Sequence, residues 1–155
     1  MTALRIVEAG PAEAAVLSAL YESAFGEAWA PDQLAQLLAG PGVFALIALD
    51  DAGEPVGYAL GRVAAGEGEL LSIALLPDRR RRGGGRLLLD ALMERCTAAG
   101  AAMLFLEVAT DNMAALGLYR GAGFHEAGLR KGYYHKVGAA AVDAIVMRRA
   151  LGDVG

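Results

Sequence analysis

The chain has one cysteine, Cys96, among its 155 residues, and no hydrophobic run that approaches the ~20 residues of a membrane span. A single cysteine excludes an intrachain disulfide and is typical of a reducing compartment, so we expect a cytoplasmic protein. Residues 1–10 show no hydrophobic signal segment, and no membrane association is expected. His125 and His135 have no partners at metal-ligand spacing, so no metal site is predicted.

The chain also lacks an excess of positive charge, because it has 14 Lys and Arg but 18 Asp and Glu, which gives a net charge of −4. A nucleic-acid-binding protein is usually basic, with cations spread over one face. Here the basic residues gather in one glycine-rich segment, residues 79–86, which reads RRRRGGGR. This contrast favours a small anionic ligand over a nucleic-acid partner, although a plain solvated loop stays open as the alternative.

Hydrophobic periodicity predicts one domain over residues 1–150 and a frayed tail over 151–155. Strands are expected at 4–8, 43–49, 55–63, 69–76, 103–109, 124–134 and 142–148, and helices at 11–24, between Pro31 and Gly40, at 84–99 and at 112–121. The expected order is three antiparallel strands, then a strand–helix–strand–helix unit, then a closing hairpin. This order fits neither a doubly wound sheet nor a sandwich. The single cysteine lies in an apolar helical pattern and is expected in the core rather than as a nucleophile.

The glycines of the segment 79–86 stand between an expected strand and an expected helix. Glycine lets backbone N–H groups converge, and a helix N-terminus adds unpaired N–H groups and the positive end of its dipole. Such a place attracts a multiply charged anion, for example a pyrophosphate. A phosphate loop would need a lysine and a hydroxyl after the glycines, and a dinucleotide fingerprint would need glycine at position 88, where Leu88 stands.

The spacing Arg80-x-x-Gly83-x-Gly85 resembles the acetyl-CoA-binding motif (Q/R)-x-x-G-x-(G/A) of the GCN5-related N-acetyltransferases, the GNAT superfamily. Residues 106–119 read LEVATDNMAALGLY, and Gly123-Phe124 follow. This segment resembles the L-E-V-x-x-x-N-x-x-A-x-x-L-Y-x-x-x-G-F pattern of the superfamily. Within the superfamily, the chain is most similar to the bacterial RimI-type protein N-terminal acetyltransferases, over about residues 4 to 149.

The resemblance implies an α/β (α+β) GNAT fold, with a mixed, mostly antiparallel sheet of roughly six to seven strands and about four helices. The sheet would be splayed at the acetyl-CoA site, with the pantetheine arm along one strand and the pyrophosphate on loop amides. The expected donor-binding residues are Ile73, Ala74, Leu75, Arg80, Arg81, Arg82, Gly83, Gly84, Gly85, Arg86, Asn112 and Tyr119. Arg79 is expected to be solvated.

The candidate catalytic residues are Glu107 and Tyr119. Strand alternation places Glu107 on one face with Met103, Phe105 and Ala109, and a carboxylate among apolar neighbours is a candidate general base. A structural glutamate satisfied by an arginine or by amides remains the alternative. The resemblance implies that the Tyr119 hydroxyl protonates the departing thiolate, whereas core packing is the alternative for Tyr119 and helix capping for Asn112.

The acceptor implied by the resemblance is a protein N-terminus, such as that of a small-subunit ribosomal protein. Four aromatic residues are the expected acceptor contacts: Phe25, Trp29, Tyr133 and Tyr134. Ordinary aromatic packing is their alternative role. The chain departs from the pattern at His135 and over residues 136–142, which puts the peptide preference in doubt. Two other functions stay open: a small-amine (polyamine, amino acid or antibiotic) acetyltransferase, and a catalytically silent acetyl-CoA-binding module.

Overall fold

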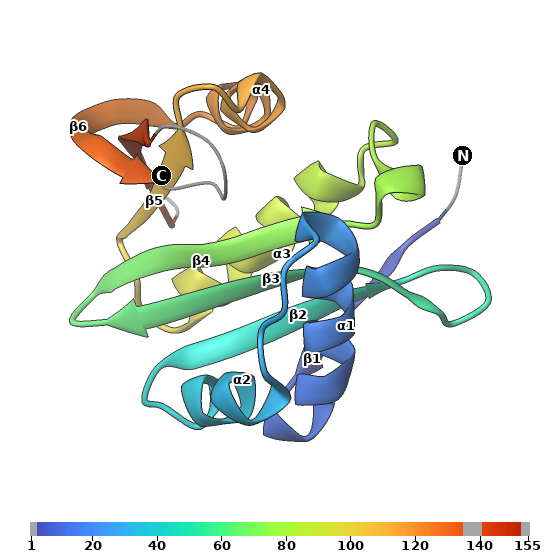
Figure 1. Cartoon of the computed structure of the whole chain (residues 1–155). Coiled ribbons are helices and arrows are strands. Elements are labelled where there is room, and N and C mark those ends of the chain that lie inside the picture. The colour runs from blue at the N-terminus through green and yellow to red at the C-terminus, as the bar shows by residue number, and fades with distance from the viewer. Residues whose placement is uncertain (1–2, 135–140, 153–155) are drawn as a thin grey trace.

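The computed structural model describes residues 3–134 and 141–152, with the side chains of residues 133 and 134 excepted. Its elements follow the expected order closely (Figure 1). They are β1 (Arg5–Ala9), α1 (Ala14–Phe25), α2 (Pro31–Leu38), β2 (Val43–Leu49), β3 (Pro55–Ala64), β4 (Glu67–Leu75), α3 (Gly84–Ala98), β5 (Met103–Ala109), α4 (Met113–Gly121), β6 (His125–Tyr134) and β7 (Val142–Ala150). Short 3-10 turns over Pro11–Glu13 and Pro77–Arg79 complete the set.

Over the described residues, the strands form one seven-stranded sheet in the order β1-β2-β3-β4-β5-β7-β6. All neighbouring strands are antiparallel except β4 and β5, which are parallel. The expected mixed, mostly antiparallel sheet is confirmed. The closing hairpin folds back on itself, so that β7 rather than β6 pairs with β5.

The parallel contact between β4 and β5 is short. It ends at the pair Glu69–Phe105, and the later residues of β4 have no partner position on β5. On the other side of β4, Leu60 faces Ser72 while Gly61 faces Leu70, so Leu71 is an extra residue in a β-bulge. A bulge bends its strand and increases the local twist, and here it lies where the two strands begin to separate. The expected splay of the sheet is therefore present.

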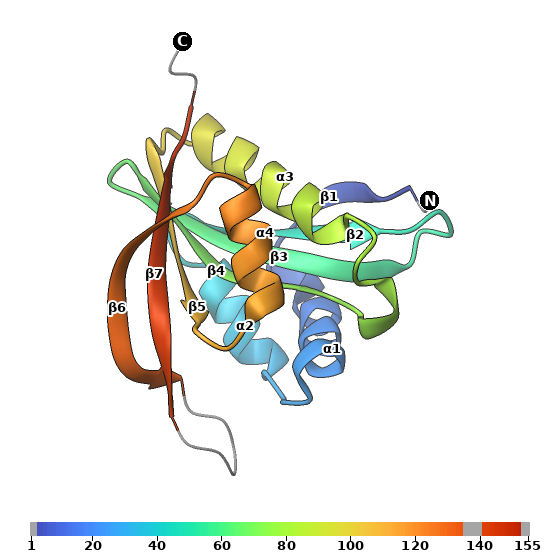
Figure 2. The same ribbon diagram turned by 90° about the horizontal axis from the view of Figure 1, so that it is seen from above.

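Two apolar layers cover the sheet from opposite faces (Figures 1 and 2). On one face, α3 packs on β2, β3 and β4, and leucines of α3, α4 and β5 share one buried cluster: Leu88, Leu89, Leu92, Leu104, Leu106 and Leu116. On the other face, α1 and α2 pack on β2 and β3 through Leu17, Leu20, Leu34, Tyr58 and Leu60. Among the described helices, none is long and apolar enough to cross a membrane. The two layers leave the splayed edge of β4 between them.

The C-terminal end of β7 corrects one expectation. Leu151, which the sequence places in a frayed tail, is buried in the layer beneath α3. Its N–H donates to the carbonyl of Ala102 at 2.8 Å, so the strand continues beyond the expected end at residue 148. The apolar side chain and this backbone bond anchor the residue, and residues 153–155 lie outside the described part.

Candidate active site

The C-terminal half of β4 presents backbone groups to the gap between β4 and β5. The N–H of Leu76 donates to the carbonyl of Val56 at 2.9 Å, and the pairing is regular from there back to Ser72. In an antiparallel ladder the backbone groups of alternate residues point to opposite edges. The N–H and C=O groups of Ile73 and Leu75 therefore point away from β3 and into the gap. An extended ligand with amide groups can pair there as an added strand would.

The loop after β4 turns sharply before α3 begins. Arg81 and Gly83 both have left-handed backbone conformations, with φ of +65° and +83°. The first intrahelical bond of α3 runs from the N–H of Leu87 to the carbonyl of Gly83, at 3.1 Å. The N–H groups of residues 84–86 consequently have no acceptor within the helix and lie at the positive end of its dipole. This arrangement can hold a diphosphate.

The three glycines of the loop serve different purposes. Gly83 has open space around it but a φ that favours glycine. Gly84 is buried, and a Cβ there would lie 3.0 Å from Leu4 Cδ1 and 3.1 Å from Leu75 Cδ1. A Cβ on Gly85 would meet Leu118 Cδ2 at an ordinary 3.5 Å, so alanine would fit. Gly83 therefore allows the turn, Gly84 the close approach of α3 to β4, and Gly85 the approach of α3 to α4.

Two arginines of the loop direct their side chains to the protein itself. Arg79 Nη2 lies 3.0 Å from Asp50 Oδ2, so the expectation that Arg79 is merely solvated is wrong. A hydrogen bond from the N–H of Glu54 is the largest cause that lowers the pKa of Asp50, and Arg79 adds to it. Arg80 Nε donates to the Leu75 carbonyl and Arg80 Nη2 to the Ala24 carbonyl, both at 3.2 Å.

Arg86, at the other end of the run, also has partners in the protein. Its Nε donates to Asp90 Oδ1 at 2.9 Å, and its Nη1 donates to the Gly121 carbonyl at the end of α4, at 3.3 Å. Arg81 and Arg82 have exposed side chains. The backbone of the loop, more than its guanidinium groups, therefore forms the candidate anion site.

Glu107 lies on β5 on the face opposite α3. Leu106 and Val108 on either side of it are buried, while the Glu107 side chain is 23% exposed. Arg130 Nη1 of β6 lies 2.8 Å from Glu107 Oε1, across the intervening β7. The arginine partner named as the structural alternative is therefore present. It orients the carboxylate, and the role of Glu107 as a base stays a prediction.

The two α4 residues singled out in the sequence occupy different environments. The side-chain oxygen of Asn112 accepts a hydrogen bond from the N–H of Ala115 at 3.2 Å, so the capping role is confirmed. Tyr119 is buried, and its ring packs edge-to-face with Phe124 at 5.9 Å between centroids. Core packing thus fixes the Tyr119 ring, and donor binding and proton donation by these residues stay predictions.

The expected acceptor aromatics are partly brought together. Phe25 is half exposed at the end of α1, and its ring lies 4.9 Å from that of Tyr21, which in turn lies 5.1 Å from Trp29. Tyr21 is not among the expected acceptor contacts, although its spacing of four residues from Phe25 on a helix is a usable signal. Burial, followed by the nearby Glu27, raises the pKa of Tyr21. The side chains of Tyr133 and Tyr134, together with residues 135–140, lie outside the described part.

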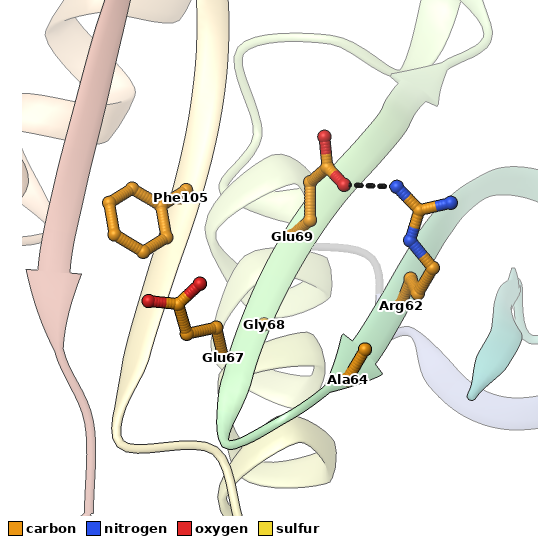
Figure 3. Close-up of a pocket in the computed structure, with 6 residues that line it drawn as sticks. All are labelled: Arg62, Ala64, Glu67, Gly68, Glu69 and Phe105. Carbon is orange, nitrogen blue, oxygen red and sulfur yellow. Dashed lines mark hydrogen bonds and ion pairs between the residues drawn. The ribbon is translucent and has the colours of Figure 1, made fainter.

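A pocket of about 320 Å³ lies where β4 and β5 are still paired (Figure 3). Its lining residues are Arg62, Ala64, Glu67, Gly68, Glu69 and Phe105, and Arg62 forms an ion pair with Glu69. Phe105 is two residues before Glu107 on β5, so both side chains lie on the same face of the sheet. Nothing in the sequence alone indicated this pocket. In the described part of the chain, no group of three or more His, Cys, Asp and Glu residues is arranged for a metal ion.

The site combines a splayed parallel strand pair, a glycine turn at the start of a helix and a carboxylate on the second strand. This combination is typical of an acyltransferase of the GNAT type. The model of the acetyltransferase (GNAT) family matches residues 14–124. The chain belongs to this family.

Two curated relatives are similar in sequence. The [ribosomal protein bS18]-alanine N-acetyltransferase of Escherichia coli (strain K12) is 40% identical over 95 residues, which cover 61% of this chain and 64% of the relative. The N-alpha-acetyltransferase RimI of Mycobacterium tuberculosis is 46% identical over 105 residues, covering 65% of this chain and 63% of the relative. The matches thus span somewhat less than two thirds of the relatives' own length.

Two solved structures extend the likeness over nearly the whole chain. The crystal structure of the ribosomal-protein-S18-alanine N-acetyltransferase from Escherichia coli superimposes with a TM-score of 0.88 at 29% identity, covering 99% of this chain and 97% of that one. A GNAT superfamily phosphinothricin acetyltransferase from Sinorhizobium meliloti, in complex with AcCoA, superimposes with a TM-score of 0.80 at 28% identity. It covers 97% of this chain and 89% of that one.

Proposed function

We propose that this protein is an acetyl-CoA-dependent N-acetyltransferase that acts on the N-terminal α-amine of a protein, of the ribosomal-protein type. One observation carries the proposal: the gap between β4 and β5 has a diphosphate-competent loop at its end and the Glu107 carboxylate on its second strand. The printed names of the two curated relatives support the acceptor, since one refers to a ribosomal-protein alanine and the other to an N-alpha amine. Such a substrate would place the reaction in the cytoplasm.

The residues present fit acetyl-CoA. The N–H groups of residues 84–86 would hold the diphosphate, with the turn at Arg81, Arg82 and Gly83 shaping the approach. The outward backbone groups of Ile73 and Leu75 would pair with the amides of the pantetheine arm, while the short side chain of Ala74 packs toward α1. The capped start of α4 at Asn112 would lie beside the arm, as the family pattern implies.

Glu107 would act as the base and Tyr119 as the acid. Acetyl-CoA supplies the acetyl group as an activated thioester. A peptide α-amine has a pKa of about 7.7–8.0, so a sizeable fraction of it is already neutral near neutral pH. Glu107 then has to accept only the one proton that the nitrogen loses as the new C–N bond forms. A backbone N–H on β4 would stabilise the charge that develops on the carbonyl oxygen. As the C–S bond breaks, the Tyr119 hydroxyl would give its proton to the thiolate.

The acceptor would approach on the face that carries Glu107. Phe25 and Trp29 would form one wall, joined by Tyr21. The family resemblance implies acceptor contacts from Tyr133 and Tyr134 as well, whose side chains lie outside the described part. Phe25 is exposed for half of its surface at the end of α1, as a contact residue must be. The Arg130 guanidinium would keep the Glu107 carboxylate turned toward the acceptor face.

A second candidate is acetylation of a small amine. The structural likeness to a phosphinothricin acetyltransferase favours it, because that relative is 28% identical over most of the chain. Donor-site residues are shared by both functions, so only the acceptor distinguishes them. A third possibility, a silent acetyl-CoA-binding module, would need no acceptor site.

An acceptor panel tests the proposal. Release of CoA would be followed with acetyl-CoA and three kinds of acceptor: peptides with a free N-terminal alanine, the same peptides with a blocked N-terminus, and small amines. We expect turnover with the free peptides alone. Turnover with small amines alone would overturn the N-terminal acceptor, and no turnover with any amine would favour the binding module. Unchanged turnover in both Glu107→Gln and Tyr119→Phe would remove the catalytic assignment.

A further inference from the structure

The Arg80 side chain connects the two sides of the candidate site. Its Nε donates to the carbonyl of Leu75, at the end of the β4 edge that faces the gap. Its Nη2 donates to the carbonyl of Ala24, which is 56 residues away in the chain and directly precedes Phe25. One planar guanidinium therefore holds the donor-side strand and the end of α1 together.

The end of α1 lacks a cation of its own. The last carbonyls of a helix accept no hydrogen bond from the helix itself, so basic side chains that donate to them are stabilising. The last turn of α1 contains no basic residue, and the helix stops at Gly26, whose φ is +71°. Arg80 supplies the missing cation and donor from the loop that precedes α3.

The loop that carries Arg80 is also the loop that an anion would order. Arg81, the next residue, has a left-handed backbone conformation with φ of +65°, which is uncommon for a residue with a side chain. A diphosphate on the N–H groups of residues 84–86 would stabilise this conformation. The position of Arg80, and with it the end of α1, would then depend on occupancy of the donor site.

We propose that Arg80 is a positioning residue that couples the donor loop to the acceptor wall formed by Phe25 and Trp29. The identity of the two sites rests on the proposed function, whereas the connection itself rests on the two Arg80 hydrogen bonds. A guanidinium can donate from two nitrogens in one rigid plane, which neither lysine nor glutamine can reproduce. Glutamine is the other residue that the family motif has here, so Arg80→Gln is expected to keep the loop and to lose the connection to Ala24.

Fluorescence of Trp29 tests the coupling without any turnover. Trp29 is the one tryptophan of the chain and packs on Tyr21 of α1, so its emission reports on the acceptor wall. We expect free CoA to change this emission in the wild type. In Arg80→Gln, CoA should still bind by calorimetry, but the change in emission should be lost. Arg79→Gln is the matched control, since it removes the same charge from the same loop but contacts Asp50, and it should respond as the wild type does.

Kinetics provide a second readout. Arg80→Gln should raise the KM for the acceptor peptide at saturating acetyl-CoA roughly fivefold or more, the usual lower range of coupling between sites. The affinity for CoA alone, measured by calorimetry without peptide, should stay within about twofold of the wild type. Arg80→Lys keeps the charge without the rigid fork and should behave in the same way, and it carries the test if the glutamine variant does not fold. A wild-type response in either variant, or an affinity for CoA alone that falls as much as the KM for the peptide rises, would overturn the coupling. If CoA fails to bind the wild type, the proposed function fails first and this proposal with it.

Discussion

The candidate donor site is built from backbone, whereas the candidate acceptor site is built from side chains of distant elements. Ile73 and Leu75 offer N–H and C=O groups and residues 84–86 offer N–H groups. The side chains of Arg79, Arg80 and Arg86 bond to the protein itself. The acceptor face instead combines Glu107 of β5, Arg130 of β6 and the aromatics at the end of α1. Changes of side chain should therefore alter catalysis and acceptor binding strongly, and alter donor binding only where the backbone itself is disturbed.

Glu107→Gln should have the largest effect and should fall on catalysis alone. Loss of a positioned base lowers kcat by about 10²- to 10⁴-fold, and the affinity for acetyl-CoA should not change because Glu107 contributes no backbone group to the loop. Steady-state kinetics and calorimetry with acetyl-CoA measure the two quantities.

Glu126→Gln is the matched control for this change. Glu126 also forms an ion pair with an arginine, Arg120, at 3.1 Å, but on an exposed surface. Its variant should retain the wild-type kcat. A Glu107→Gln enzyme with kcat within twofold of the wild type would contradict the assignment of the base.

Gly83→Ala should have an intermediate effect and should fall on the donor alone. A side chain at a left-handed φ costs about 1–2 kcal/mol, which the loop can relieve only by moving the N–H groups at the start of α3. We expect the dissociation constant for acetyl-CoA to rise roughly tenfold, the equivalent of ~1.4 kcal/mol, with kcat little changed at saturation.

Gly53→Ala separates strain from function. Gly53 has a φ of +80° and open space, as Gly83 does, but lies in the turn between β2 and β3. Thermal unfolding should show similar destabilisation of the two variants, and calorimetry should show weaker acetyl-CoA binding in Gly83→Ala only. Equal binding by both would mean that the loop backbone does not hold the donor.

Cys96→Ala should have the smallest effect, since Cys96 belongs to neither site. Burial raises the pKa of its thiol to about 11, and Arg95 offsets part of this rise. The folded state therefore keeps the proton that the unfolded state loses above pH ~9, and stability falls as pH rises from about 9 to 11. The free energy of unfolding, measured by denaturation, should fall less between pH 8 and pH 10 in Cys96→Ala than in the wild type. The kcat of the variant should be unchanged. A large loss of kcat would indicate a catalytic thiol.

The sequence predicts the local features of the molecule well. Periodicity and Gly40, which follows the second helix, place the helices and strands closely, and the side-chain alternation around Glu107 is as expected. The turn that forms the candidate anion site could also be predicted, because the glycines and the helix that follows them are adjacent in the chain.

The long-range features could not be predicted in this way. The bond from Arg80 to Ala24 depends on the packing of α1 beside the loop, and no pattern near either residue reveals it. The pair of Glu107 and Arg130 depends on the insertion of β7 between β5 and β6. An arginine partner for Glu107 could be expected from the sequence, but no pattern near Glu107 indicates which arginine it is.

The position of the acetyl group on a product is the most direct test of N-terminal acetyl transfer assisted by Glu107. A peptide with a free N-terminal alanine and an internal lysine would be incubated with the protein and acetyl-CoA near pH 7.5, and tandem mass spectrometry would locate the added acetyl group. At this pH a large fraction of the α-amine is neutral, whereas the lysine amine, with a pKa of about 10.4, is almost fully protonated. We predict acetylation at the α-amine, dependent on Glu107. Acetylation at the lysine alone, or of the α-amine at an equal rate in Glu107→Gln, would contradict it.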